Sequence, residues 1–384
     1  MKLTRTIKLK LNIPETELLP TIQEYTKAYN FVCQQGWQDK DYNAISLHNK
    51  TYKIVRKQFN LPSQLAISSR TKAVESLKSV KSKKKKVSCP HSKQASIRYD
   101  KNSITIWFEK ECISILTIDG RKKYPIQIPE YFKQYITWKK CSADIFIRNH
   151  TVFLNIVVST EKTDIPKKDT YIGIDRGIKK IAVTSEKQFF SGSKIKHITN
   201  KHEKLKSSLQ SKGTKSAKRH LKKLSKKVNR FRADVNHCIS KQIIQSIDQG
   251  STIIIENLKG IRQTVRLRKK QRRELHKWNF YQFEQFLKYK GEEKGIKVEY
   301  VSARYTSQKC SKCGHISRSN RKNQSQFKCS QCSYQLNADL NAAFNIKNNY
   351  LDSISYPGGA AVNQPIVVSS LKDSYKPVPS GTGS

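Results

Sequence analysis

The stretch YIGIDRGIKKIAV, residues 171–183, carries the pattern that decides the fold of the larger part of this chain. Two short apolar runs, YIGID and KIAVTS, are separated by a tight polar turn and predict two adjacent strands. The apolar runs STIIIE (251–256) and IKVEYVS (296–302) predict two further strands. Long helical patterns separate these runs, and this alternation is typical of an α/β domain.

Three acidic residues stand at the ends of predicted elements of this domain. Asp175 ends the first run, Glu256 ends the run STIIIE, and Asp339 opens the helical pattern DLNAAFNI. An acid at the end of a buried strand is costly unless it is paired or binds a metal. Asp339 could also serve as a helix cap, and each acid taken alone could be structural. Together they have the arrangement of an RNase H-like site, in which carboxylates hold two Mg²⁺ ions about 3.5–4 Å apart.

Four of the nine cysteines form two CxxC pairs. Cys310 and Cys313 make the first pair, Cys329 and Cys332 the second, and fifteen residues lie between the pairs. This spacing predicts a four-cysteine ribbon that holds one structural zinc. No further ligand is evident, so a catalytic zinc is not expected; four free thiols or a lost site are the alternatives.

The chain is strongly basic, with 75 Lys and Arg against 29 Asp and Glu among its 384 residues and a formal net charge of +46. Such a charge repels itself unless a polyanion neutralises it, and nucleic acid is the expected polyanion. A passive basic protein of the ribosomal type fits the charge equally well, and a membrane surface fits it less well. No apolar run approaches the roughly 18–20 residues that a membrane span needs.

The N-terminal half has a different pattern. Alternating apolar residues from Leu3 to Ile13 predict a half-buried strand rather than a signal peptide, so we expect an intracellular protein with reduced thiols. Residues 15–82 have helical spacing, and a lysine-rich loop, VKSKKKKVSCP, follows. Residues 95–160 hold short β-rich runs that predict a small barrel or sandwich, into which the first strand could pair. Residues 161–168 are the expected linker.

Basic residues are concentrated in two segments of the C-terminal half. A long helical region, broken near Gly213, has an apolar stripe and a cationic outer face that we expect to contact nucleic acid. The basic residues of this face are Lys222, Lys223, Lys226, Lys227, Arg230 and Arg232. A second basic loop, IRQTVRLRKKQRREL (261–275), precedes an amphipathic helix predicted over residues 280–294.

Several of these motifs resemble those of the TnpB family of transposon-encoded, RNA-guided DNA endonucleases. YIGIDRGIKKIAV and IIIENLKG (253–260) resemble its first and second RuvC motifs. TSQKCSKCG, FKCSQC and NADLNAAFNI resemble its zinc-ribbon and third RuvC motifs, in the family's order. The resemblance covers residues 171–349 and reaches the N-terminal half only through its architecture. Ser333 departs from the family, which commonly has Gly there, and Ser can adopt a strained turn only at some cost.

The resemblance implies an α+β multidomain fold. Residues 1–14 and 92–165 would form a wedge-like β-barrel, with residues 15–91 inserted as a helical recognition domain. Residues 170–303 and 336–350 would form an RNase H-like (RuvC) nuclease domain, with residues 304–335 inserted as the zinc ribbon. Residues 351–384 would be a disordered tail.

The resemblance also implies a function. The chain would be a metal-dependent endodeoxyribonuclease that cuts double-stranded DNA beside a short flanking motif, guided by an RNA from the transposon end. Asp175, Glu256 and Asp339 would bind two catalytic Mg²⁺, and the four cysteines one structural Zn²⁺. The protein would act as a monomer in the cytoplasm of a prokaryote, and its binding to DNA would associate it with the nucleoid.

Other functions remain open at this point. A catalytically silent, RNA-guided DNA-binding regulator would lack one of the acids, and a small type V CRISPR effector would share all of these motifs. A DDE-type transposase is also RNase H-like, but a zinc ribbon just before the third acid argues against it. A passive basic RNA-binding protein requires the three acids to be coincidental.

Overall fold

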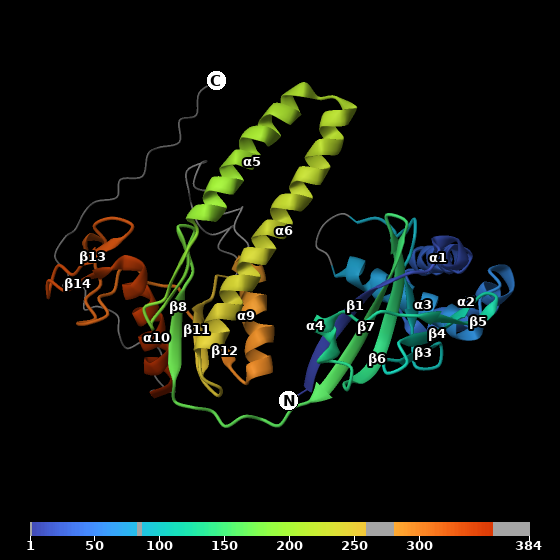
Figure 1. Ribbon diagram of the computed structural model, residues 1–384, viewed down its shortest axis with the longest axis horizontal. Coiled ribbons are helices and arrows are strands. Elements are labelled where there is room, and N and C mark those ends of the chain that lie inside the picture. Colours follow the sequence, from blue (N-terminus) through green and yellow to red (C-terminus); the bar gives the residue numbers. More distant parts are fainter. Residues whose placement is uncertain (1, 83–86, 259–279, 356–384) are drawn as a thin grey trace, which may run out of the picture. The chain divides into compact units, whose positions relative to one another are not determined.

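The computed structural model describes residues 2–82, 87–258 and 280–355 (Figure 1). The chain divides into two compact units, Met1–Thr163 and Asp164–Ser384, and each is described by itself. The second basic loop of the sequence, residues 261–275, lies outside the described residues, as does most of the predicted tail.

The first unit holds two antiparallel sheets. The four-stranded sheet has the order β1-β7-β6-β2, and the three-stranded sheet has the order β3-β4-β5. Their bounds are β1 (Lys2–Leu11), β2 (Ile97–Tyr99), β3 (Ile104–Trp107), β4 (Cys112–Thr117), β5 (Gly120–Pro125), β6 (Lys139–Arg148) and β7 (Thr151–Glu161). A closed barrel requires a hydrogen-bonded neighbour at both edges of every strand. Because no strand pairing joins the two sheets within the described residues, the barrel expected from the sequence is not formed as one continuous sheet.

Three helices lie between the first strand and the rest of its sheet. They are α1 (Glu15–Gln38), α2 (Ala44–Gln58) and α3 (Ser63–Lys81); the short α4 (Glu130–Lys133) follows later. β1 pairs with β7 over its whole length, from Lys2↔Glu161 to Leu11↔Val152. The helices are therefore an insertion into the sheet. The inward residues of β1, such as Ile7 and Leu9, pack with the buried stripe of α1 because successive strand residues face opposite sides.

The second unit is an α/β domain. Its five-stranded sheet has the order β10-β9-β8-β11-β12. The strands are β8 (Tyr171–Asp175), β9 (Lys180–Thr184), β10 (Phe189–Ser191), β11 (Thr252–Glu256) and β12 (Lys297–Val301). β8, β11 and β12 are parallel neighbours, whereas β9 runs antiparallel to β8, which confirms the adjacent strand pair predicted from the sequence.

Helices connect and cover these strands. They are α5 (Ser193–Lys212), α6 (Lys215–Ser246), α9 (Phe280–Lys294) and α10 (Ala338–Ser355). Gly213 ends α5 with φ +63°, a left-handed conformation that favours glycine, and this is the break predicted in the basic helical region. The small elements β13 (Gln326–Lys328), β14 (Gln335–Asn337) and the 3₁₀ turn Arg318–Asn320 belong to the cysteine-rich segment.

The last helix packs very closely on the first strand of the sheet. A Cβ atom at Gly173 would lie 2.1 Å from the carbonyl oxygen of Ala343 and 2.8 Å from the backbone nitrogen of Lys347. Only glycine therefore allows α10 to lie on β8, which explains the glycine of YIGID. α10 runs through Ser355, so residues 351–355 are helical and not part of the predicted disordered tail; Leu351 packs against a small core that includes Tyr171. No helix among the described residues has the length and apolarity to cross a membrane.

Candidate active site and metal centre

The fold brings the three predicted carboxylates to one region. Asp175 is the last residue of β8 and Glu256 the last residue of β11. These strands are parallel neighbours, so both acids lie at the same edge of the sheet. Asp339 stands in the first turn of α10, the helix that packs on β8.

The electrostatics show that Glu256 and Asp339 both act on Asp175. Burial and the neighbouring carboxylates of Glu256 and Asp339 raise the pKa of Asp175 to about 8. Burial also raises the pKa of Glu256 and of Asp339. Glu256 is buried, and Asp175 and Asp339 are partly buried. Three poorly solvated carboxylates in one region are unfavourable unless a cation compensates them, and a pKa shift as large as that of Asp175 is typical of functional sites.

Arg321 is the cation whose charge acts on all three acids, whereas Arg176 acts on Glu256 and Lys179 and Lys180 act on Asp339. Nη2 of Arg321 donates to Oδ1 of Asp339 at 3.1 Å, and its charge lowers the pKa of all three carboxyl groups. Sequence reasoning missed it because a basic residue in a ribbon loop has no distinctive spacing. The carboxylates themselves do not converge on one point, since the four cysteines are the only metal-binding group of Cys, His, Asp or Glu among the described residues.

A second contact missed from the sequence orients Glu256. Thr306 donates its Oγ1 proton to Oε1 of Glu256 at 2.5 Å, and both side chains are buried. Thr306 opens the motif TSQKCSKCG that leads into the first cysteine pair. The segment before the ribbon therefore positions one of the three carboxylates.

The alternative role of Asp339 as a helix cap is wrong. Oδ1 of Asn337 accepts the backbone N–H groups of Asp339 and Leu340, at 3.1 and 3.2 Å, so Asn337 caps the helix. The carboxylate of Asp339 is left to pair with Arg321 and to face the other two acids.

The raised pKa of Asp175 predicts a pH-dependent stability. Because its folded pKa of about 8 exceeds the unfolded value of 3.8, the stability that this group contributes is complete below about pH 4. It is lost as the pH rises through about 8. Asp175→Asn should therefore stabilise the Mg²⁺-free protein at pH 8.5, by an amount on the order of a few kcal/mol, and change it little at pH 4. Thermal unfolding in Mg²⁺-free buffer, with zinc retained, measures this. A loss of stability in Asp175→Asn at pH 8.5 would instead mark a structural acid.

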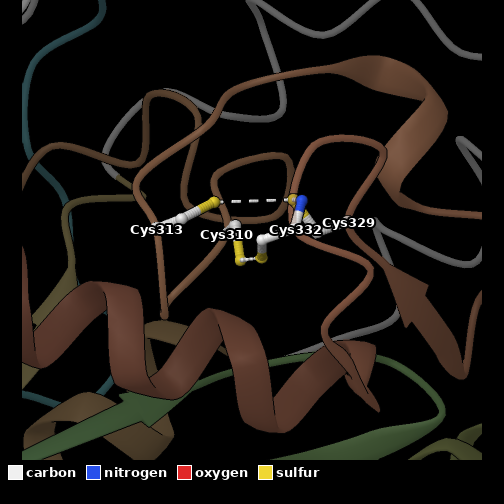
Figure 2. A group of neighbouring side chains, drawn as sticks. All are labelled: Cys310, Cys313, Cys329 and Cys332. Atoms are coloured by element: carbon white, nitrogen blue, oxygen red, sulfur yellow. Dashed lines mark hydrogen bonds between the residues drawn. The ribbon is translucent and has the colours of Figure 1, made fainter.

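The four cysteines of the ribbon lie together as predicted (Figure 2). Their sulfur atoms all lie within 4.8 Å of one another, with Cys310 and Cys332 at 3.8 Å and Cys313 and Cys329 at 3.6 Å. Four thiolates at about 2.3 Å from one tetrahedral zinc are spaced roughly in this way. The cluster therefore fits a structural zinc site.

The ribbon is attached to the helix that carries Asp339. The buried Asn341 and Asn345 of α10 both donate to the carbonyl of Lys309, at 2.8 and 2.6 Å. Asn345 also donates to the carbonyl of Thr306 at 2.8 Å. Because Lys309 precedes Cys310 directly, the position of the metal cluster is linked to the position of the acids.

The two CxxC turns are similar, apart from one residue. Gly314 follows the first pair with φ +78°, and Ser333 follows the second with φ +54°. Each donates its N–H to the carbonyl of the first cysteine of its pair. A side chain in this conformation costs about 1–2 kcal/mol, so Ser333→Gly should stabilise the ribbon by up to about this amount. The thermal midpoint of the zinc-loaded protein measures the gain; Ser330→Gly, in the same turn, is the control and should not stabilise it.

The six basic residues predicted to contact nucleic acid all lie on α6, and Arg232 is half-buried while the others are exposed. They line two grooves that α5 and α6 form together. Lys222 and Arg232 line a groove of about 460 Å³ that they share with Lys206 of α5. Lys223, Lys226, Lys227 and Arg230 line a second groove, which shares His202 and Leu224 with the first. The sequence predicts a basic region broken near Gly213 and basic contacts on its second half, and the structure adds residues of α5, such as His202, to both grooves.

Two family models match the second unit, and one of them begins in the last strand of the first unit, β7. OrfB_IS605, described as a probable transposase, matches residues 155–262, and the Cas12f1-like TNB domain matches residues 280–346. The first match includes Asp175 and Glu256, and the second includes the four cysteines and Asp339.

Individual proteins and structures give the same result. The chain is 41% identical over 136 residues to a CRISPR-associated endodeoxyribonuclease Cas12f1 of Sulfoacidibacillus thermotolerans, covering 35% of this chain and 31% of that protein. It is 29% identical over 256 residues to the TnpB-like protein MJ0751 of Methanocaldococcus jannaschii, covering 62% and 91%. The chain spans less than half the length of the Cas12f1 relatives first matched. A cryo-EM structure of a Cas12f1–sgRNA–target DNA complex has the same fold, with TM-score 0.64, 17% identity and coverage of 86% and 82%.

Proposed function

We propose that this chain is an RNA-guided DNA endonuclease, because its sequence is similar to those of TnpB-like and Cas12f proteins. The observation that carries the proposal is that Glu256 and Asp339 lie near enough to Asp175 to raise its pKa, in a unit that also holds the four-cysteine cluster. RNA and DNA are the proposed partners, and the charge of +46 supports both.

The proposed reaction is phosphodiester hydrolysis at the carboxylate edge of the sheet, which we assign to an RNase H-like (RuvC) domain. The donor set fits Mg²⁺, because three carboxylates whose pKa values are raised by desolvation lie in one region, and carboxylate oxygens are the ligands that Mg²⁺ prefers. When bound, Mg²⁺ would activate a water and stabilise the leaving oxygen. Asp175, Glu256 and Asp339 would hold the ions, and Thr306 would orient Glu256. Arg321 would turn from Asp339 to the scissile phosphate.

The remaining parts have proposed roles in binding. The first unit, with its inserted helices α1–α3, would form the wedge and recognition domains that read the DNA motif beside the target. The α5–α6 hairpin would contact nucleic acid phosphates, and the zinc ribbon would close the nuclease site. A guide from the transposon end, a monomeric protein and cleavage of both strands belong to this proposal.

The RNA that co-purifies with the protein tests this proposal. Sequencing should recover one RNA species with a variable end, and the protein with that RNA should cut a plasmid that matches the variable end. Recovery of many unrelated RNAs would favour a passive basic protein. A single guide with binding but no cutting would favour a silent regulator.

Nucleic acid binding by the hairpin predicts a strong salt dependence. The logarithm of RNA affinity should fall linearly with the logarithm of salt concentration, with a slope of about 0.7–0.9 per phosphate contacted. A variant in which Lys223, Lys226, Lys227 and Arg230 are all replaced by Gln should lose about 3 from that slope, if each of the four contacts one phosphate. The double variant Lys222→Gln/Arg232→Gln tests the first groove in the same filter-binding series. An unchanged slope in both variants would place the RNA on another surface.

A further inference from the structure

Arg176, the residue after Asp175, is buried beside the proposed active site. Its side chain is 0% exposed, and its Nη1 lies 3.2 Å from Oε2 of Glu284 in α9. Its Nη2 donates to the backbone carbonyl of Glu256. Glu284 is itself held by Tyr300 of β12, whose hydroxyl donates to Oε1 at 2.6 Å. The guanidinium therefore connects the end of β8 to the end of β11 and to α9.

This connection begins where the hydrogen-bonded ladder ends. The pairing of β8 with β11 runs from Tyr171↔Thr252 to Ile174↔Ile255 and stops there. The next residues on the two strands are Asp175 and Glu256, which carry the proposed metal ligands. Among the described contacts, the Arg176 guanidinium is the link between the two strand ends at this level.

We propose that Arg176 is a positioning residue that sets the spacing of Asp175 and Glu256 and, through it, the affinity of the site for divalent cations. This inference rests on the proposed nuclease function. The planar guanidinium can donate to a carbonyl and a carboxylate at once in a fixed geometry. Lysine offers a single flexible ammonium group instead. Arg176 does not bind the metal or the substrate; it acts on Glu256 through the hydrogen bond to its backbone carbonyl and through its positive charge.

The test compares Arg176→Lys and the double variant Arg176→Met/Glu284→Gln with the wild type, each as the full chain with its guide RNA. The double variant removes the ion pair without leaving a lone buried charge. Partners that orient metal ligands typically contribute about 10–100-fold to metal affinity or activity. We expect cleavage at low Mg²⁺ to fall by about this factor in both variants. A higher Mg²⁺ concentration should restore cleavage. The affinity of the protein alone for Mn²⁺, measured by electron paramagnetic resonance, should fall in parallel.

Lys290→Met is the matched control. Lys290 is also a half-buried cation that donates to a backbone carbonyl, that of His237 at 2.6 Å, but it joins α6 to α9 away from the acids. The Lys290→Met substitution should lower the thermal midpoint of the protein and leave the Mg²⁺ dependence of cleavage unchanged. Unchanged Mn²⁺ binding in both Arg176 variants, or a cleavage loss that Mg²⁺ does not restore, would overturn the inference. If the wild type cuts no matched target, the proposed function fails, and Mn²⁺ binding still decides the role of Arg176.

Discussion

Neutralising any one of Asp175, Glu256 and Asp339 should abolish cleavage, with a loss on the order of 10³-fold or more. The three acids would bind the same pair of ions at one scissile phosphate, and residues that act as a unit are each indispensable. The variants Asp175→Asn, Glu256→Gln and Asp339→Asn keep the shape of each side chain while they remove its charge. Cleavage of a matched linear DNA, measured beside guide and target binding, separates the chemical step from recognition.

Binding should persist in all three variants or become slightly tighter. Each substitution removes a negative charge near the phosphates, so electrostatic repulsion decreases. Glu299→Gln, on the neighbouring strand β12, is the matched control and should cut normally. Normal cutting by any of the three variants would remove that residue from the site. A parallel loss of binding, cutting and thermal stability would identify a structural acid.

Loss of the zinc should have the second largest effect on cleavage. Cys310→Ser or Cys329→Ser removes one of four clustered thiolates, and a small ribbon gains much of its folding free energy from the metal. Asn341 and Asn345 attach the ribbon to α10, and Thr306 and Arg321 reach the acids from the same segment. Cleavage should therefore fall to background even though no carboxylate changes.

Metal analysis and proteolysis measure this effect. The wild type should hold one zinc per chain, and each variant should lose it and become sensitive to protease within residues 304–337. Cys238→Ser, at an exposed position on α6, is the control and should keep both zinc and activity. A folded, active protein without zinc would contradict the prediction.

Much of the second unit could be predicted from local sequence because its signals are short-range. Apolar runs that end in an acid mark β8 and β11, and the CxxC spacing marks the ribbon. Each of these patterns depends on residues within one element or one turn. The helix predicted over residues 280–294 and the break at Gly213 follow from the same kind of local rule.

Contacts between distant segments could not be predicted in this way. Arg321 lies beside Asp339, and Thr306 contacts Glu256, across 18 and 50 residues of sequence. Asn337, not Asp339, caps α10, because the choice between two polar residues depends on where the helix starts in space. The six basic residues of α6 line two grooves because α5 packs along the same helix.

The sequence by itself determined the strand ends that carry the acids, the four metal-binding thiols and the basic character of the long helices. It did so because periodicity, turn residues and ligand spacing are local properties. Only the tertiary structure decided which side chains surround those acids. The parallel pairing of β8 with β11 and the close approach of α10 at Gly173 bring Asp175, Glu256 and Asp339 together. Arg176 is the clearest case: its motif is visible in the sequence, but its contacts with Glu256 and Glu284 arise only when three separate elements pack around one buried guanidinium.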